Sequence, residues 1–246
     1  MRKQFTSLNG KWLFSAPVLG PQPREILVPF CPESKLSGIG YTDFIGECEY
    51  RRTFSAEAPR EGERVFLHFG AVDYEATVFV NGEKAGTHRG GYTPFSLDIT
   101  SLIKSGDNEL RVKVTHNVSA NLPSGKQSKQ RDSFGCFYTR VTGIWQSVWL
   151  ERTPADYIKK VCFFPDAQNG SVAVQLCVEG CGKAEIDILY EGEPAGHAEG
   201  EVCARRTFSV PLKVSRLWEP GNGRLYDVVL RYGGDEVKSY FGLRDV

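Results

Sequence analysis

The stretch EATVFVNGEKAGTHRGG, Glu75 to Gly91, decides the fold class of this chain. Apolar residues alternate with polar ones up to a central Asn81-Gly82 pair. Asn-Gly readily takes the positive φ angles of a type I′ turn, the turn that joins adjacent antiparallel strands. The runs on both sides of the pair are therefore predicted to fold back on each other as a β-hairpin.

Further strand signals lie on both sides of this hairpin. ECEYRRTFS (47–55), RVFLHFG (64–70) and GDNELRVKV (106–114) each place apolar residues at every second position, between clusters of Gly, Pro, Asn and Asp. Long segments with a helical apolar stripe are missing, apart from a short helical turn expected near Thr100. The sequence therefore predicts an all-β chain.

The length of 246 residues suggests two domains. The strong β pattern pauses at ERTPADY (151–157), which is typical of a short linker. The prediction is a jelly-roll domain of the sugar-binding type over residues 1–153, followed by an immunoglobulin-like β-sandwich over 154–246. Strand runs spaced by roughly 8–12 residues support the sandwich assignment of the second part.

The charge balance narrows the choice of partners. Thirty basic and thirty acidic residues give a formal net charge of zero, which predicts no nucleic-acid and no membrane partner. The basic N-terminus lacks the apolar run of a signal peptide, so a cytoplasmic location is expected. Seven cysteines form no regular framework and are predicted to be reduced and mostly buried, including the C-x3-C pair Cys177 and Cys181.

Motifs that would demand an enzyme are missing from the sequence, and neither a cofactor nor a metal site is predicted. His68 reads as a half-buried strand residue and His88 as packing at the end of the hairpin. Asp73 and Glu75 would share one strand face, and the prediction for both is a solvated surface rather than a catalytic pair.

Two segments carry aromatic residues that could contact a ligand. The long polar loop SGKQSKQRDSFGCFYTRVTG (124–143) contains Phe134, Phe137 and Tyr138, and its use for sugar stacking or for packing between domains is equally well supported. In GIWQSVWLE (143–151), alternation puts Trp145 and Trp149 on one face. Since both faces of that strand are largely apolar, packing in the core and against a neighbour is predicted for it.

Several phrases, taken in order, resemble family 2 glycoside hydrolases, the group of β-galactosidases, β-glucuronidases and β-mannosidases. They are SLNGKWLF (7–14), VFVNGEKAGTHRGGYTPFSLDIT (78–100), GDNELRVKV (106–114), TGIWQSVWLE (142–151), RLWEPGNGRLYDVVL (216–230) and FGLRDV (241–246). The resemblance implies retaining hydrolysis of β-glycosides by a following (β/α)8 barrel, which supplies both catalytic glutamates. This chain is expected to be the non-catalytic N-terminal portion, with no catalytic residue of its own and with the barrel and a carbohydrate as partners.

The resemblance also nominates site residues. In several members an aspartate of the jelly roll reaches the sugar site from six residues before the glycine that is here Gly143, and that position is Phe137. Asp132, Phe137 and Tyr138 are therefore the substrate-binding candidates, with Asp132 reaching in or the aromatic rings stacking on sugar. A free-standing carbohydrate-binding module, or an adhesion or scaffold module, is the alternative; the sugar is left open, and oligomers are possible.

Overall fold

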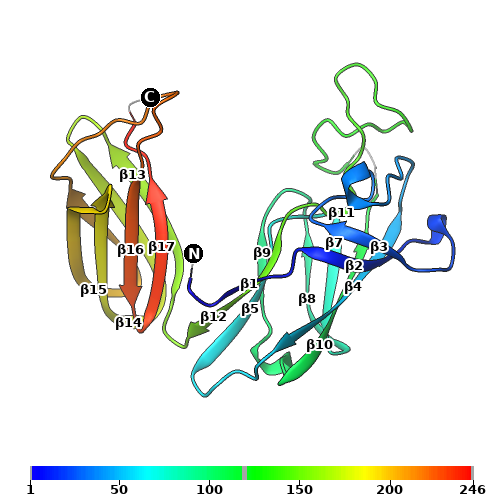
Figure 1. Ribbon diagram of the computed structural model, residues 1–246, viewed down its shortest axis with the longest axis horizontal. Coiled ribbons are helices and arrows are strands. Elements are labelled where there is room, and N and C mark those ends of the chain that lie inside the picture. The colour runs from blue at the N-terminus through cyan, green and yellow to red at the C-terminus, as the bar shows by residue number, and fades with distance from the viewer. Residues whose placement is uncertain (1, 118–120, 245–246) are drawn as a thin grey trace. The chain divides into compact units, whose positions relative to one another are not determined.

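The computed structural model describes residues 2–117 and 121–244, and its regular structure there is almost entirely β (Figure 1). The chain forms two compact units: Thr6–Glu151, called here the jelly-roll unit, and Met1–Phe5 together with Arg152–Val246, called the second unit. The all-β prediction is confirmed. The boundary between the two units lies between Glu151 and Arg152, two residues before the predicted boundary between 153 and 154. The first residues of the chain belong to the second unit.

The jelly-roll unit is built from three sheets. Their strand orders are β1-β12-β5-β9, β3-β2-β4-β10-β7-β8 and β11-β6. The strands are β1 (Phe5–Ser7), β2 (Gly10–Ser15), β3 (Arg24–Val28), β4 (Glu47–Ala56), β5 (Glu63–Phe69), β6 (Val72–Asp73), β7 (Glu75–Val80), β8 (Glu83–Arg89), β9 (Phe95–Asp98), β10 (Gly106–Thr115), β11 (Gly143–Ile144) and β12 (Val148–Pro154). Three short 3-10 helices accompany them: η1 (Pro17–Leu19), η2 (Lys35–Ser37) and η3 (Thr100–Leu102).

The hairpin expected around Asn81 and Gly82 is present as β7 and β8. Both turn residues have positive φ, 52° and 88°, and the strands pair from Val80 opposite Glu83 outward. The Asn81 side chain also donates to the Leu102 carbonyl at 2.8 Å. The turn is therefore tied to η3 as well as closed by its own backbone.

The core of the jelly-roll unit follows the alternation read from the sequence. In β4 and β10, Tyr50 lies opposite Val112 and both are fully buried. Arg52 is a charged residue on the inward side of β4, and its guanidinium donates to the carbonyls of Leu8 and Asn9 at 2.8 and 3.0 Å. These hydrogen bonds, just before β2, satisfy the charged group where it leaves the apolar pattern.

The GIWQSVWLE segment is divided into β11 and β12 by a break at 145–147. Ile144 and Val148 are buried, which confirms that one face lies in the core. The Trp145 indole N–H donates to the Gly91 carbonyl at 2.8 Å, and the Trp149 ring stacks on His68 with centroids 5.0 Å apart. Both tryptophans are partly buried and pack within the unit; contact of their face with a neighbour remains a prediction.

His88 behaves as its position suggested. Its ring stacks on Phe95 with centroids 4.1 Å apart, and its Nε2 lies 3.1 Å from the Gly90 carbonyl. The packing prediction for His88 is confirmed, as is the structural role of His68 in β5.

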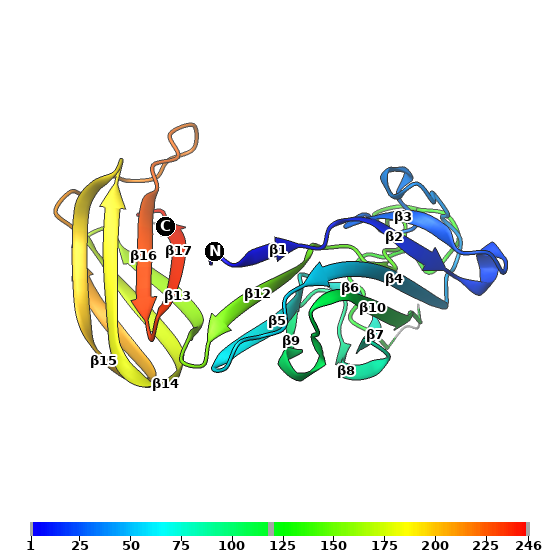
Figure 2. The ribbon, with the colours of Figure 1, turned by 60° about the horizontal axis from the view of Figure 1, so that its bottom comes forward.

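The second unit is a sandwich made by five strands. They are β13 (Ile158–Asp166), β14 (Ser171–Tyr190), β15 (Glu193–Pro211), β16 (Tyr226–Tyr232) and β17 (Asp235–Phe241), in the order β13-β14-β16-β17 with β15 paired to β14. Figure 2 shows β14 and β15 as long curved ribbons. β14 is one strand over its whole length, and its register with β15 shifts between Cys177 and Cys181.

The cysteine prediction is wrong for one pair. Cys181 and Cys203 lie directly opposite each other in the β14–β15 ladder and form a disulfide. The other five cysteines are free, as predicted, but only Cys48 of these is buried, so the prediction of mostly buried thiols is also wrong. Pairing two cysteines requires the register of two long strands, which the spacing of cysteines along the sequence does not reveal.

The first residues join the second unit through Arg2. Its guanidinium contacts the carboxylate of Asp235 at 2.9 Å and the carbonyl of Ile158, whose own N–H donates to Asp235 at 2.9 Å. The Asp235 side chain is almost completely buried, so this ion pair is largely shielded from solvent.

Candidate functional site

The loop that follows β10 carries all three residues nominated from the sequence, and it projects from the jelly-roll unit in Figure 1. Within it, Phe134 and Phe137 exchange two backbone hydrogen bonds of 2.8 and 3.1 Å around a tight turn at Gly135-Cys136. The two rings stack with centroids 5.1 Å apart, and they are 43% and 37% exposed. We call Phe134, Phe137 and Tyr138 the aromatic tip.

Tyr138 lies beside a second tyrosine that the sequence did not single out as a site residue. The hydroxyls of Tyr138 and Tyr92 both approach Gly125, each 3.3 Å from where a Cβ on that glycine would lie. The Tyr92 hydroxyl donates to the Ser124 carbonyl at 2.8 Å, and burial raises the pKa of Tyr92 to about 12. Since Tyr92 and Tyr138 are each 45% exposed, their rings extend the aromatic surface of the tip.

Asp132 is held by its backbone. Its carbonyl accepts a hydrogen bond of 2.7 Å from the Ser128 hydroxyl, while its side chain is exposed. The structure therefore brings Phe137 and Tyr138 together with Phe134 and Tyr92, and it leaves the Asp132 carboxylate in solvent just before the turn.

A buried arginine organises the base of the loop. The side chain of Arg140 is among the largest that are fully buried. Its guanidinium donates to four carbonyls, those of Ser128, Gln130, Arg131 and Thr42, and it lies 4.2 Å from the centre of the Phe44 ring. The planar guanidinium can donate to several acceptors at once, so this one side chain binds three carbonyls of the loop and one carbonyl of the segment before β4.

Gln127 and Asp73 make the second anchor. Gln127 Nε2 donates to Asp73 Oδ2 at 2.7 Å, and Gln127 Oε1 accepts from the Val141 N–H at 2.9 Å. Gly91 closes the space, because a Cβ there would lie 2.6 Å from the carboxylate. Burial raises the pKa of Asp73.

The predicted solvated face is therefore wrong for Asp73. Only 2% of this residue is exposed, because β11, seventy residues later, pairs with β6 and places Gly143 opposite it. Glu75 does face solvent, where it pairs with Arg89 at 2.9 Å.

His116 lies between Asp73 and another buried acid, Glu33. The Thr142 hydroxyl donates to Glu33, so it must accept from His116 Nδ1, which lies 3.1 Å away. His116 Nε2 then presents its lone pair toward Asp73 Oδ1 at 3.7 Å. Burial, with a contribution from the Arg140 charge, lowers the pKa of His116 to about 4, and the imidazole is neutral at neutral pH.

These buried groups support the loop. Their charges are enclosed by backbone and by neighbouring side chains, whereas the aromatic tip presents ring faces to solvent. Ring faces can stack on sugar rings or on apolar groups attached to them. The arrangement therefore presents exposed ring faces at the end of a loop whose base is anchored by buried hydrogen bonds.

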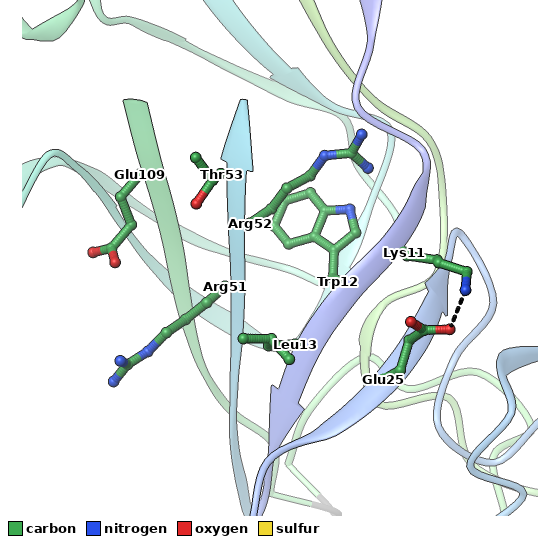
Figure 3. A pocket seen from close by; sticks show the side chains of 8 residues that line it. All are labelled: Lys11, Trp12, Leu13, Glu25, Arg51, Arg52, Thr53 and Glu109. Carbon is green, nitrogen blue, oxygen red and sulfur yellow. Dashed lines mark ion pairs between the residues drawn. The ribbon is translucent and has the colours of Figure 1, made fainter. Parts of the chain in front are cut away.

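A separate hollow of about 400 Å³ lies on the six-stranded sheet (Figure 3). Glu25 of β3 and Glu109 of β10 both line it, yet the strand order places β2 and β4 between them. Three strand spacings amount to about 14 Å, beyond the roughly 5–9.5 Å between the two carboxyl groups of a glycosidase. The hollow therefore lacks the geometry of a glycosidase centre.

One group of potential metal ligands occurs among the described residues. Glu185, Asp187 and His197 have ligand atoms within 4.8 Å of one another. The Arg231 guanidinium lies 2.6 Å from Asp187 and 3.5 Å from Glu185, so a side-chain cation already pairs with these carboxylates.

Comparison with known proteins agrees with this architecture. Residues 33–156 match the family model described as glycosyl hydrolase 2 galactose-binding domain-like, and this segment contains the loop and both of its anchors. The chain belongs to this family. The β-galactosidase of Thermoanaerobacter pseudethanolicus is 37% identical over 198 residues, which cover 74% of this chain and 25% of that enzyme.

Two further relatives extend the match to the second unit. The β-glucuronidase of Paenibacillus borealis is 26% identical over the whole of this chain and 46% of its own length. The structure of Bifidobacterium dentium β-glucuronidase complexed with coumarin-3-O-glucuronide matches with a TM-score of 0.78 at 22% identity, over 99% of this chain and 48% of that one. The chain described here thus spans about a quarter to a half of the length of these three relatives.

The relatives are carbohydrate-processing enzymes longer than this chain, and the family assignment confirms the resemblance seen in the sequence. Among the described residues, no helix has both the length and the apolar character needed to cross a membrane.

Proposed function

We propose that the whole protein is a retaining β-glycosidase, acting on terminal β-galactosides or β-glucuronides, and that this chain is its non-catalytic N-terminal portion. The chemistry would come from two carboxyl groups of a barrel, one protonating the leaving oxygen and the other forming the glycosyl intermediate. The chain's own part is to hold the aromatic tip and Asp132 beside the sugar site.

The observation that carries this proposal is the way the loop is built. Arg140 and Gln127 tie its base to buried acceptors, while Phe137 and Tyr138 are left exposed at its end. Exposed aromatic rings on a well-anchored loop are costly unless something covers them, and a binding site is the usual reason for such a surface. The match to glycosidases of two substrate classes supports a β-glycoside as that ligand.

The test measures hydrolysis of nitrophenyl β-galactoside and β-glucuronide by the product of the full reading frame. Phe137→Ala is expected to raise KM for the preferred substrate by about tenfold with a smaller effect on kcat, which corresponds to about 1.4 kcal/mol of lost binding. Phe164→Ala, at an exposed phenylalanine of β13, is the matched control. The 246-residue chain alone should be inactive.

Hydrolysis by the isolated chain would contradict the non-catalytic assignment. Kinetic constants of Phe137→Ala equal to those of Phe164→Ala would contradict the role of the aromatic tip, and activity on neither glycoside would contradict the proposed substrates.

A cytoplasmic location is part of the proposal, and the Cys181–Cys203 disulfide provides its test. Structural disulfides are rare in reducing compartments. Titration of free thiols in protein isolated from its native cells under acid quench should find both cysteines reduced if the location is cytoplasmic. Their recovery as a disulfide would contradict it.

A further inference from the structure

The outer face of the six-stranded sheet carries two adjoining hollows of about 400 and 450 Å³. Arg51 of β4 lines both of them as their shared wall, and we call the two neighbouring hollows together the sheet groove. The residues that matter below are Lys11, Leu13, Glu25 and Glu109 in its first half and Glu47, Glu49 and Lys113 in its second. Figure 3 shows the first half, with Arg51 and Leu13 side by side.

The charges of the outward side chains that line the sheet groove nearly cancel. The three cations are Lys11, Arg51 and Lys113, and the four carboxylates are Glu25, Glu47, Glu49 and Glu109, so the formal sum is minus one. The Arg52 guanidinium does not count among them, because it is bound to the carbonyls of Leu8 and Asn9 on the inner side of the sheet. A groove of this composition gives a polyanion such as nucleic acid no long-range attraction. It does offer many charged hydrogen-bonding groups that alternate in sign.

Several of these charges are already paired. Lys11 of β2 lies 2.9 Å from Glu25 of β3, and Glu49 of β4 contacts Arg51 on its own strand and Lys113 of β10. Exposed pairs of this kind add little to folding stability, because solvent screens them. They do hold the donors and acceptors in fixed positions, where a ligand hydroxyl can accept from the cation and donate to the carboxylate.

An apolar surface lies between these pairs. Leu13 is 54% exposed, and the sheet register places it between Glu25 of β3 and Arg51 of β4. Apolar side chains flanked by charged hydrogen-bonding groups match a sugar ring, which presents C–H faces and peripheral hydroxyls. The hollows also have the volume of small-ligand sites.

We propose that the sheet groove is a second binding site, distinct from the aromatic tip, for a neutral oligosaccharide that crosses strands β3, β2, β4 and β10. One sugar ring rests on Leu13, and the hydroxyls of the chain bridge the paired charges. This site lets the protein hold a glycan chain independently of the proposed hydrolysis.

The experiment is calorimetric titration of the 246-residue chain with short neutral gluco-, galacto- and manno-oligosaccharides. At least one is expected to bind with a dissociation constant of about 0.01–1 mM. Arg51→Ala, which removes the wall shared by both hollows, and Leu13→Asp, which charges the apolar surface, should each weaken binding by about tenfold or more. Arg64→Ala on β5 of the other sheet is the matched control and should bind as the parent chain does.

Phe137→Ala separates this site from the aromatic tip, because binding lost in Phe137→Ala and kept in Arg51→Ala would place the sugar at the tip and not in the sheet groove. Thermal unfolding of every variant must match that of Arg64→Ala, so that lost binding is not lost folding.

Four results would overturn the proposal: no binding of any neutral oligosaccharide, binding abolished by Phe137→Ala alone, tighter binding of sulfated or uronate chains that salt suppresses, or a dimer in sedimentation that Arg51→Ala dissociates. The last result would make the groove an interface between two copies of the chain.

Discussion

Gln127 and Asp73 are separated by 54 residues in the sequence, and their side chains meet in a buried hydrogen bond of 2.7 Å. Gln127 belongs to the loop that carries the aromatic tip, whereas Asp73 ends a strand of the scaffold. The loop is thus joined to the jelly-roll unit by an amide bound to a buried carboxylate, and hydrogen bonds to charged groups are stronger than those between neutral ones.

Replacing Gln127 with Leu should destabilise the jelly-roll unit by about 2–3 kcal/mol, because it leaves Asp73 and the Val141 N–H buried without their partner. Urea unfolding followed by tryptophan fluorescence measures this change, since Trp12, Trp145 and Trp149 lie in that unit. Gln146→Leu, at an exposed glutamine, is the control and should change stability by less than about 0.5 kcal/mol. Equal unfolding midpoints for the two variants would show that the anchor is unimportant.

Arg140→Lys should loosen the loop while conserving the charge. An ammonium cannot reach four carbonyls as the guanidinium fork does, so part of the loop backbone loses its partner. Limited trypsinolysis after Lys129 and Arg131, quantified by mass spectrometry, should be faster by about tenfold, since cleavage follows the population of the opened loop. Arg60→Lys, at an exposed arginine, should digest as the parent protein does, and equally slow cleavage in Arg140→Lys would contradict the anchoring role.

His116 predicts a loss of stability on mild acidification. Its pKa is lowered to about 4 in the folded protein, against 6.5 when unfolded. Between these values the unfolded state binds the additional proton, so stability rises with pH across the window and falls as pH drops below about 6.5. The loss should approach about 3 kcal/mol near pH 4, because each tenfold change in proton concentration across this window is worth about 1.4 kcal/mol.

His116→Asn removes this proton site and keeps a donor toward Thr142. The difference in unfolding free energy between the parent chain and this variant should therefore shrink or reverse as the pH falls from about 6.5 to 4. The raised pKa of Asp73 acts in the opposite direction, because its ionisation costs stability as the pH rises above its unfolded value near 3.8, so Asp73→Asn is measured in parallel. A difference independent of pH would contradict a neutral buried imidazole.

Local sequence patterns predicted those parts of the molecule that short-range interactions determine. The Asn81-Gly82 turn needs only two residues able to take positive φ, and the burial of Tyr50 and Val112 follows from the period of two. The aromatic loop was located because its composition differs from that of the strands. Phe137 and Tyr138 were nominated by resemblance, and the structure shows them exposed on that loop.

The remaining features depend on contacts between distant segments. Asp73 is buried only because β11 and Gln127 cover it, and neither lies near it in sequence. Cys181 and Cys203 meet only through the register of two long strands. The burial of Gln127 and Arg140 cannot be predicted from the sequence around them, because glutamine and arginine are common in solvated loops.

Gly143 allows the close approach of β11 to Tyr50. Replacing it with alanine adds backbone strain and overlap with the Tyr50 ring, and comparison with Gly82 separates these two contributions. Its φ is 72°, and an added Cβ would lie 2.8 Å from Cε2 of the Tyr50 ring. Gly143→Ala should therefore cost about 3–5 kcal/mol, from backbone strain together with overlap in a packed core. Gly82→Ala has a similar φ of 88° and open space around it, so it should cost only about 1 kcal/mol. Combining Gly143→Ala with Tyr50→Phe removes the hydroxyl that the new methyl group meets, and urea unfolding should show partial recovery; equal costs for the two glycine variants would mean that the approach to Tyr50 is unimportant.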